Sequence, residues 1–455
     1  MSSVEVPSLL MIFMIFLGDV ILSALQSIPY GICAILISRI FKYGQNTVLS
    51  AFFSSALFAV TEHFQTFIEQ TKFLGLIGFP WVVNYITQHK FLVGIQSASL
   101  FGAGFITIII IFVNALLAYC IVAEYKKRIV CIVSAASVFS INIFYGVFAL
   151  SFSSKHDYTI TSVVYQDNNS SYSKWVTSSK DVCDEFIADM EEYFESGNNA
   201  DIIVLSETVF TTSFGKDRAN CSSSGRYIYD RLSDFSAKYD CAVIFGGFSE
   251  DDDGEHNSMF AIDKGVFCEN VYHKRTLVPF GEYLPYENIL LKLVPSLANF
   301  NLSGSFLSAG KESQIFNTET VKIGGIICYD SIFYYNTRKS VSEGAQIIAL
   351  STNDSWYNDS SAIYQHYAHS AFRAIETGRY LMRSATTGVS GILDNHGKTI
   401  SQSKIFEKEI ISADVQLLNG KTLFVRIGYS YLYALFGITI GYLVYKTIKT
   451  RRKKL

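Results

Sequence analysis

The sequence predicts a protein of two parts, a group of membrane-spanning helices and a water-exposed domain of alternating strands and helices. Charged residues make up only 17% of the 455 residues, against roughly 25% in ordinary soluble proteins. These charges are unevenly spread, because residues 1–150 carry only 12 of them. From Asp157 onward, short β-rich runs alternate with helical patterns, which is typical of a layered α/β fold.

Five apolar runs approach or exceed the length of about 20 residues that a helix needs to cross a bilayer. They are Leu9–Ile40, Tyr43–Thr61, Phe91–Ala123, Ile129–Ser154 and Ile427–Tyr445. A cleaved signal peptide is the alternative for the first run, but it would need a basic region before its apolar core. Because Arg39 is the first basic residue, we expect a span there. The predicted membrane regions are therefore residues 1–154, with about four spans, and residues 427–455.

The basic residues predict the orientation of these spans, since short basic loops remain in the cytoplasm. Such residues lie at Arg39 and Lys42, at 126–128 and throughout the tail 446–455. All three positions place the same side of the membrane in the cytoplasm. Residues 155–426 should then fold outside it, as an extracytoplasmic domain. The block 151–445 carries a net charge of −11 and shows no basic surface that would suit nucleic acid.

The outer domain shows strand and helix patterns in alternation. The expected strands are Thr159–Val164, Ile202–Leu205, Ala242–Gly246, Val266–Tyr272, Val321–Cys328, Ile347–Ser351, Leu381–Ala385 and Val389–Leu393. The expected helices are Trp175–Phe194, Gly225–Tyr239 and Ala362–Gly378. The acidic run Glu250–Glu255 is interpreted as a solvated hairpin loop. About 260 residues are enough to build a complete hydrophobic core.

The cysteines give no sign of a metal site or of a disulfide framework. There are eight, none forms a C-x-x-C pair, and no Cys/His cluster has zinc-ligand spacing. Cys33, Cys120 and Cys131 fall in membrane runs, where packing is the expected role. Cys328 differs, because it ends an apolar strand and could be presented to a cleft.

Three strand ends together offer the groups of a nucleophilic site. A cysteine nucleophile needs a nearby base or a positive field to form its thiolate. Glu207 follows one predicted strand, and Lys274 follows another, as Cys328 does. Taken singly, each has an ordinary explanation, packing for the cysteine and a solvated edge for the two charged residues. Their order along the chain, Glu, Lys and Cys, gives the set its meaning.

Several motifs surround these residues. They are Tyr272-His273-Lys274, Leu277-Val278-Pro279-Phe280-Gly281-Glu282-Tyr283, Ile327-Cys328-Tyr329, Asn353-Asp354-Ser355-Trp356-Tyr357, Gln365-His366, Arg373-Ala374-Ile375-Glu376-Thr377-Gly378-Arg379, Arg383-Ser384, Gly388-Val389-Ser390, Thr61-Glu62-His63 and Gly78-Phe79-Pro80-Trp81. On these motifs the chain resembles the nitrilase, or carbon-nitrogen hydrolase, superfamily. Within it, the chain resembles the membrane-embedded apolipoprotein N-acyltransferase branch over nearly its whole length. The resemblance implies an α-β-β-α sandwich.

The resemblance also implies the roles of the three residues. Glu207 would be the general base, Lys274 the stabiliser of the oxyanion and Cys328 the nucleophile. The acyl donor would be a phospholipid, and the acceptor the N-terminal amine of a diacylglyceryl-cysteine lipoprotein, with a Cys328 thioester between the two half-reactions of a ping-pong cycle. That reaction is the last step of lipoprotein maturation, in the cytoplasmic (inner) membrane of a bacterium. The resemblance implies no cofactor and no metal.

Supporting residues follow by position. Glu282 matches a glutamate that helps to hold the lysine, although a structural salt bridge is an equal alternative. Tyr329 would offer its backbone N–H to the oxyanion, and Trp175 matches an aromatic position near the acyl pocket. Trp356 lies with Asn353 and Tyr357 on a loop after a strand, where site residues are common. For the charged residues of 373–379, a buried ion-pair network is favoured over a site.

The sequence departs from the family pattern at three places. Asp330 stands where the family has glutamate, so any direct contact would need a shifted backbone or a bridging water. Ser206 stands where family members often have proline. On the family pattern we also expect about three further N-terminal membrane helices before the first run, and we interpret their lack as a loss or as a misassigned start.

Two other functions remain open on the sequence. A membrane-anchored nitrilase-type amidase or hydrolase would use the same three residues but pass the acyl group to water. A scaffold without catalysis would have no physical need for all three. An apolar arm over the site would favour lipid transfer, and Ile289–Leu307 is the segment that could form one, although a packed loop explains it equally well.

Overall fold

The computed structural model describes residues 8–44, 46–69, 78–81, 83–151, 158–170, 173–215, 218–293 and 306–452. The chain divides into two compact units. A membrane unit comprises Met1–Val83, Gly104–Ile141 and Tyr429–Leu455, and a catalytic unit comprises Asn84–Ala103 and Asn142–Gly428. The strands, and the three residues predicted to form the site, all belong to the catalytic unit.

The membrane unit is helical. Its long helices are α1 (Ser8–Tyr43), α2 (Thr47–Glu69), α5 (Ala103–Val122), the first part of α6 (Tyr125–Ser151) and α14 (Ser430–Arg452). In the described part of the chain, these five helices are long and apolar enough to cross a membrane. One apolar cluster joins α1, α2 and α14 through Cys33, Phe53 and Leu443. A second joins α2, α5 and α6 through Leu116 and Cys131.

The apolar run Phe91–Ala123 does not form the single span that its composition predicts. It begins with two short helices, α3 (Leu92–Ile95) and α4 (Ala98–Phe101), and α5 starts only at Ala103. Gly102 separates them with a φ of +76°, and a Cβ there would lie 2.4 Å from the ring of Phe424. A residue with a side chain would be strained at that backbone angle. The break is therefore set by one glycine within an uncharged run, and hydropathy does not reveal it.

The catalytic unit contains two β-sheets. The first has the order β13 (Glu409–Gln416), β1 (Thr159–Gln166), β2 (Ile202–Val204), β3 (Ala242–Asp251), β4 (Gly254–Asp263) and β5 (Val266–Phe267), with β6 (Tyr272–His273) also paired to β4. The second has the order β12 (Thr399–Gln402), β11 (Gly391–Leu393), β10 (Leu381–Ala385), β9 (Ile347–Thr352), β8 (Lys322–Ile327) and β7 (Ile315–Asn317). In both sheets the central strands are parallel, β1–β2–β3 in one and β8–β9–β10 in the other.

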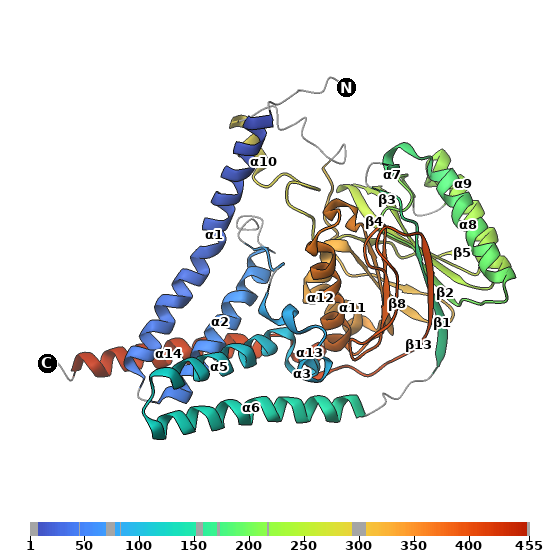
Figure 1. Ribbon diagram of the computed structural model, residues 1–455. Coiled ribbons are helices and arrows are strands. Elements are labelled where there is room, and N and C mark those ends of the chain that lie inside the picture. The colour runs from blue at the N-terminus through green and yellow to red at the C-terminus, as the bar shows by residue number, and fades with distance from the viewer. Residues whose placement is uncertain are drawn as a thin grey trace. The chain divides into compact units, whose positions relative to one another are not determined.

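Helices cover the outer faces of the two sheets (Figure 1). They are α8 (Ser179–Glu195) and α9 (Ser223–Lys238) on the first sheet, and α11 (Tyr334–Glu343) and α12 (Ser361–Thr377) on the second. Successive side chains of β1 point to opposite faces of the sheet, so they pack in two different hydrophobic cores. Val164 points into the core between the sheets, while its neighbour Val163 packs with Phe186 under the helices. The predicted α-β-β-α sandwich is therefore confirmed.

Several elements differ from the expectation. The helix expected at Trp175–Phe194 is broken into α7 (Ser173–Val176) and α8, because Ser178 caps the N-terminus of α8. The strand expected at Val266–Tyr272 is only the two short strands β5 and β6. The acidic hairpin is tighter than expected, since pairing continues to Asp251 and Gly254. Helix α10 (Glu287–Leu293) begins the apolar segment, and residues 294–305 lie outside the described part of the chain.

Candidate active site

The fold brings Glu207, Lys274 and Cys328 together at one edge of the sandwich. Glu207 follows β2, Lys274 follows β6 and Cys328 follows β8. The carboxyl ends of parallel strands meet at one edge of a sheet, which is where α/β proteins place their sites. Gly246 on β3 permits the close approach, because a Cβ there would lie 2.3 Å from the amide nitrogen of Thr208.

A buried network of charges forms the centre of the site. Lys274 Nζ donates hydrogen bonds to Glu207 Oε1 at 3.0 Å and to Glu282 Oε1 at 2.8 Å. The Lys274 side chain is only 1% exposed. Asn257 Nδ2 also donates to both carboxylates, at 2.7 and 3.2 Å. The other oxygen of Glu207 accepts the backbone N–H of Asn353 at 2.7 Å. Each of these contacts favours the ionised form of the carboxylates.

Electrostatics keep both members of the central pair charged. Burial alone would raise the pKa of Glu207, but the ammonium groups of Lys274 and then Lys174 hold it below its ordinary value. Burial alone would lower the pKa of Lys274, but Glu207 and Glu282 raise it well above its ordinary value. At neutral pH the pair is a carboxylate and an ammonium. Glu207 is therefore free of a proton and able to accept one.

Cys328 is presented on a strained turn. It ends β8 and starts the 3-10 helix η4 (Cys328–Ile332) with a φ of +48°, a conformation that residues with side chains rarely adopt. Burial, and then the charge of Glu207, raise the pKa of its thiol to about 12, while Lys274 opposes the rise. The resting group is thus a thiol. It becomes a nucleophile only when a base takes its proton, and Glu207 is the carboxylate that acts most strongly on its pKa.

Asp330 anchors the turn that carries Cys328. Its carboxylate directly accepts hydrogen bonds from the Tyr272 hydroxyl at 2.8 Å, the Thr276 N–H at 2.7 Å and Asn336 Nδ2 at 3.1 Å. These contacts join β6 and the following loop, which hold Lys274, to the helix that starts at Cys328. The shorter aspartate therefore reaches its partners directly. Tyr329 is buried beside Phe333, with ring centroids 5.1 Å apart.

A second buried network lies behind Cys328. Asp354 accepts from Arg383 Nη2 at 2.7 Å and lies 2.8 Å from His366 Nδ1. The other ring nitrogen of His366 lies 2.9 Å from the Ser331 hydroxyl and 3.2 Å from the Cys328 carbonyl oxygen. The pKa of His366 is lowered by burial and then by Arg383, so the imidazole is neutral. Through His366, the network contacts Cys328 and Ser331 and so supports the helix η4.

The two tryptophans of the predicted site lie at the surface. Trp175 is 45% exposed, and its ring centroid is 6.1 Å from that of Phe248. Trp356 is 53% exposed, on η5 (Asp354–Tyr357) after β9. Both side chains therefore offer apolar surface, Trp175 from the short helix α7 after β1 and Trp356 from η5 after β9. Neither takes part in the buried hydrogen bonds of the centre.

The charged residues of 373–379 are structural. Arg373 pairs with Glu376 at 2.8 Å, and Glu376 also accepts the backbone N–H of Ala103 at 2.8 Å. Arg379 lies beyond the end of α12 and instead donates to the carbonyl oxygens of Ala345 and Gly420. The favoured interpretation, an ion-pair network, thus holds for the first two residues and not for the third.

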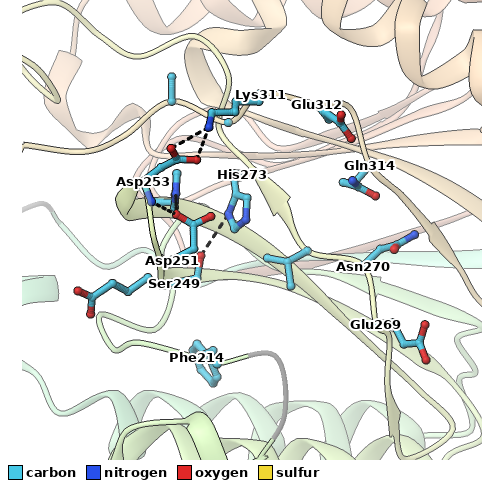
Figure 2. A pocket seen from close by; sticks show the side chains of 16 residues that line it. Phe214, Ser249, Asp251, Asp253, Glu269, Asn270, His273, Lys311, Glu312 and Gln314 are labelled. Atoms are coloured by element: carbon cyan, nitrogen blue, oxygen red, sulfur yellow. Dashed lines mark hydrogen bonds and ion pairs between the residues drawn. The ribbon is translucent and has the colours of Figure 1, made fainter.

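An open cavity of about 310 Å³ in the catalytic unit is separate from the buried centre. Figure 2 shows its polar lining, in which Lys311 reaches Asp253 and His273 faces Ser249. His273 and Lys274 are consecutive, but only His273 lines the cavity. Cys328 and Glu207 do not line it. This opening is therefore a poor guide to the chemistry of this protein.

Sequence reasoning missed four residues of the two buried networks. Asn257 lies in the polar middle of β4, which was not predicted as a strand. In the sequence, Asp354 and His366 are recognisable only as parts of motifs. Trp175 is a predicted site residue, but its neighbour Lys174 is not. Lys174 is 4% exposed, and its Nζ donates to the backbone carbonyl oxygen of Glu207. A lysine beside a tryptophan has no periodic signal, so only the structure reveals its position.

Comparisons with known proteins agree with this geometry. The model of the carbon-nitrogen hydrolase family matches residues 167–421. Curated relatives named Apolipoprotein N-acyltransferase include those of Borreliella burgdorferi, at 25% identity over 81% of this chain and 71% of that protein, and of Gloeobacter violaceus, at 28% over 78% and 65%. A third, from Rhizobium rhizogenes, is 27% identical over 92% of this chain and 76% of its own length.

The chain thus spans between about two thirds and three quarters of the length of these relatives. The resemblance to apolipoprotein N-acyltransferases that the sequence indicated is confirmed. So is the expected class of protein, an acyltransferase enzyme. The matched region contains both sheets' parallel strands apart from β1, together with all three residues of the centre. Since this region is more than half of the chain, the protein belongs to the carbon-nitrogen hydrolase family.

Proposed function

We propose that this protein transfers an acyl chain from a phospholipid to the N-terminal α-amine of a diacylglyceryl-cysteine lipoprotein, through a thioester on Cys328. The observation that carries the proposal is the buried contact of Lys274 with Glu207, 3.0 Å apart, in electrostatic reach of the Cys328 thiol. This arrangement supplies a base, a positive charge and a nucleophile in a site shielded from water. The names of the curated relatives supply the substrate class.

In the first half-reaction, Cys328 Sγ attacks the ester carbonyl carbon of the phospholipid. Glu207 takes the thiol proton as the S–C bond forms, because the thiol is protonated at rest. Lys274 and the Tyr329 backbone N–H stabilise the oxyanion, an effect that is usually the largest in acyl transfer. The C–O bond then breaks, and Glu207 returns its proton to the leaving alkoxide. The products are a lysophospholipid and the acyl-thioester of Cys328.

In the second half-reaction, the neutral α-amine of the lipoprotein attacks the thioester carbonyl. Glu207 accepts a proton from the amine nitrogen, the C–S bond breaks, and that proton passes to the departing sulfur. The N-acylated lipoprotein leaves, and the Cys328 thiol is restored. Glu282 keeps Lys274 charged and in place throughout, since Lys274 Nζ lies 2.8 Å from Glu282 Oε1.

The cellular setting belongs to the same proposal. The protein would lie in the cytoplasmic (inner) membrane of a bacterium, with about four spans in residues 1–154, a catalytic domain at 155–426 and a last span with a basic tail at 427–455. The basic residues after the first, third and last apolar runs support an extracytoplasmic position for the catalytic domain. Lipoproteins and phospholipids are both held at a bilayer, so a membrane-anchored enzyme meets both substrates.

The test follows the acyl group by intact mass. Purified full-length protein is incubated with phospholipid vesicles, and the expected result is one acyl adduct, located on Cys328 by peptide mapping. A diacylated lipopeptide is then added, and the adduct should disappear as the peptide becomes N-acylated. Cys328→Ala should form no adduct. Cys268→Ala removes a half-buried cysteine of the same unit and should behave as wild type.

Three outcomes would contradict the proposal. Absence of an adduct on the wild type would exclude thioester formation from phospholipid. An adduct that is lost to water at the same rate with and without the lipopeptide would identify a membrane-anchored hydrolase. Transfer by Cys328→Ala would show that another group carries the acyl chain.

A further inference from the structure

A second buried lysine lies against the backbone of Glu207. Lys174 belongs to the short helix α7 and is 4% exposed. Its Nζ donates a hydrogen bond to the carbonyl oxygen of Glu207. An ammonium this deeply buried is costly unless a specific contact compensates for its lost hydration. The contact here is with the peptide of the proposed base, on the main chain rather than on its carboxylate.

Asp167 contacts the preceding residue, Ser206, through its side chain. Its Oδ1 accepts the hydroxyl of Ser206 at 3.0 Å, and its carboxyl group is buried, which raises its pKa. Lys174 thus contacts the main chain of Glu207, and Asp167 contacts the side chain of Ser206. The Glu207 carboxylate is held separately, by Lys274, Asn257 and the Asn353 N–H. The backbone and the side chain of the base therefore have independent supports.

We propose that Lys174 is a positioning residue for the general base, fixing the Glu207 peptide so that its carboxylate remains directed to Lys274. This inference rests on the proposed function, because it concerns the base of that reaction. The buried ammonium also adds positive charge beside Glu207, which favours the ionised carboxylate needed to accept a proton. A misplacement of about 1 Å in a catalytic group can reduce a rate by about 100-fold, so a main-chain anchor at this position has a large effect.

The charge on Lys174 is sensitive to alkaline pH. Burial lowers its pKa to about 8, against the opposing electrostatic effects of Asp167, Glu207 and Cys328. These groups come from the ends of β1, β2 and β8, and Lys274, after β6, is the other cation near Glu207. Lys274 keeps its proton in this range, because its pKa is raised. Above about pH 8, Lys174 therefore loses its charge first, and base-dependent acylation of Cys328 should decline.

The experiment compares Lys174→Met, Lys174→Arg and the exposed control Lys398→Met, all as full-length protein. The rate of Cys328 acylation is measured by intact mass in single turnover, between about pH 6 and about pH 10. Two probes are used, phospholipid vesicles and the small activated ester p-nitrophenyl acetate. At pH 7, Lys174→Met should be slower by about 10- to 100-fold with both probes and should show no decline above pH 8. Lys398→Met should match wild type.

Lys174→Arg provides the decisive result. A guanidinium keeps its charge at all pH values used, so this variant should recover part of the rate, and its alkaline decline should disappear or move to higher pH. A wild-type rate and pH profile for Lys174→Met would overturn the inference. So would an unchanged decline near pH 8 in Lys174→Arg, which also decides the matter if the methionine variant does not fold.

The two probes separate this inference from the proposed function. If wild type reacts with p-nitrophenyl acetate but not with phospholipid, the lipid function fails, and the ester still tests Lys174. If both probes acylate wild type and Lys174→Met equally, the function stands and the role of Lys174 is rejected.

Discussion

Two buried charge networks of the catalytic unit differ in their balance of charge. The network around Lys274 contains one ammonium between two carboxylates, Glu207 and Glu282. The network around Asp354 contains one carboxylate with one guanidinium, from Arg383, and a neutral imidazole. Apart from Glu282, whose side chain is 14% exposed, the residues of both networks are nearly free of solvent. Burial alone therefore does not distinguish a reactive site from a structural one.

The difference in charge matches the difference between the roles that we propose for the two networks. The network around Asp354 has one negative and one positive charge, so any change of protonation within it would leave a buried charge unpaired. We therefore interpret it as structural. The network around Lys274 has a surplus carboxylate, with Lys174 nearby, so one proton can enter without leaving the ammonium alone. Proton acceptance from Cys328 is then compatible with a stable fold. Four substitutions test this contrast, from the largest expected effect to the smallest.

Lys274→Met should have the largest effect. It removes the proposed oxyanion stabiliser and leaves Glu207 and Glu282 as two carboxylates around Asn257. Cys328 acylation should fall by about 1,000-fold, and the free energy of unfolding by about 3–5 kcal/mol. Single-turnover mass spectrometry and denaturant unfolding in detergent measure the two quantities. Adding Glu282→Gln should recover stability but not acylation; recovery of acylation would reassign the role of Lys274.

Asp354→Asn should mainly affect stability. Burial would raise the pKa of Asp354, but Arg383 and then His366 hold it well below its ordinary value. Because the folded-state pKa lies below the unfolded one, its stabilisation is complete above about pH 4 and is lost as the pH falls further. The variant should unfold about 3 kcal/mol more easily at pH 7, and this gap should narrow below about pH 4.

The thermal midpoint in detergent, followed from neutral to acid pH, checks that prediction. Asp252→Asn is the matched control, because Asp252 is exposed on the β3–β4 turn. A constant gap between Asp354→Asn and wild type at all pH values would show that Asp354 is not an ionised brace.

Gly246→Ala should affect catalysis more than stability. The new Cβ would lie 2.3 Å from the Thr208 nitrogen and 2.8 Å from the Ser206 carbonyl oxygen, so the backbone that carries Glu207 must move. We expect acylation of Cys328 to fall by about 10- to 100-fold. Gly420→Ala, with no heavy atom within 4 Å of the new Cβ, should leave the rate unchanged. Equal rates for both variants would show that the Glu207 position tolerates displacement.

Lys311→Ala should have the smallest effect. Lys311 pairs with Asp253 at 2.6 Å, but both side chains are largely exposed, and such pairs contribute less than about 1 kcal/mol. The acylation rate should equal that of wild type, because the cavity of Figure 2 is separate from the buried centre. A loss of acylation of tenfold or more would place this cavity within the site after all.

The sequence was sufficient where a signal is local. Strand ends offered Glu207, Lys274 and Cys328 as candidates, the family resemblance selected them as a set, and β-rich alternation predicted the layered fold. It was insufficient where structure depends on partners. Strand β4 contains Glu255, His256 and Asn257, whose polarity resembles a loop until β3 pairs with it. Helix α11 is similarly polar, and a neighbouring sheet rather than its own pattern makes it a helix.

The break at Gly102 and the buried contact of Lys174 with Glu207 both show this limit. An uncharged run contains no mark of the turn that Phe424 requires at Gly102. Nothing in the sequence around Lys174 predicts its hydrogen bond to the carbonyl oxygen of Glu207. Both depend on contacts between residues far apart in the chain. Composition and spacing describe neighbours in sequence, so they cannot specify such contacts.

The pairing of β1 with β13 has a consequence for the modularity of this protein. The strands are antiparallel, and Thr159 at the start of β1 is opposite Gln416 at the end of β13. The sandwich therefore begins and ends at adjacent points of one sheet, as an insertion does. A short linker could close the gap that removal of residues 159–416 would leave. The two chain connections of the sandwich, before Thr159 and after Gln416, therefore leave it at one place on the first sheet.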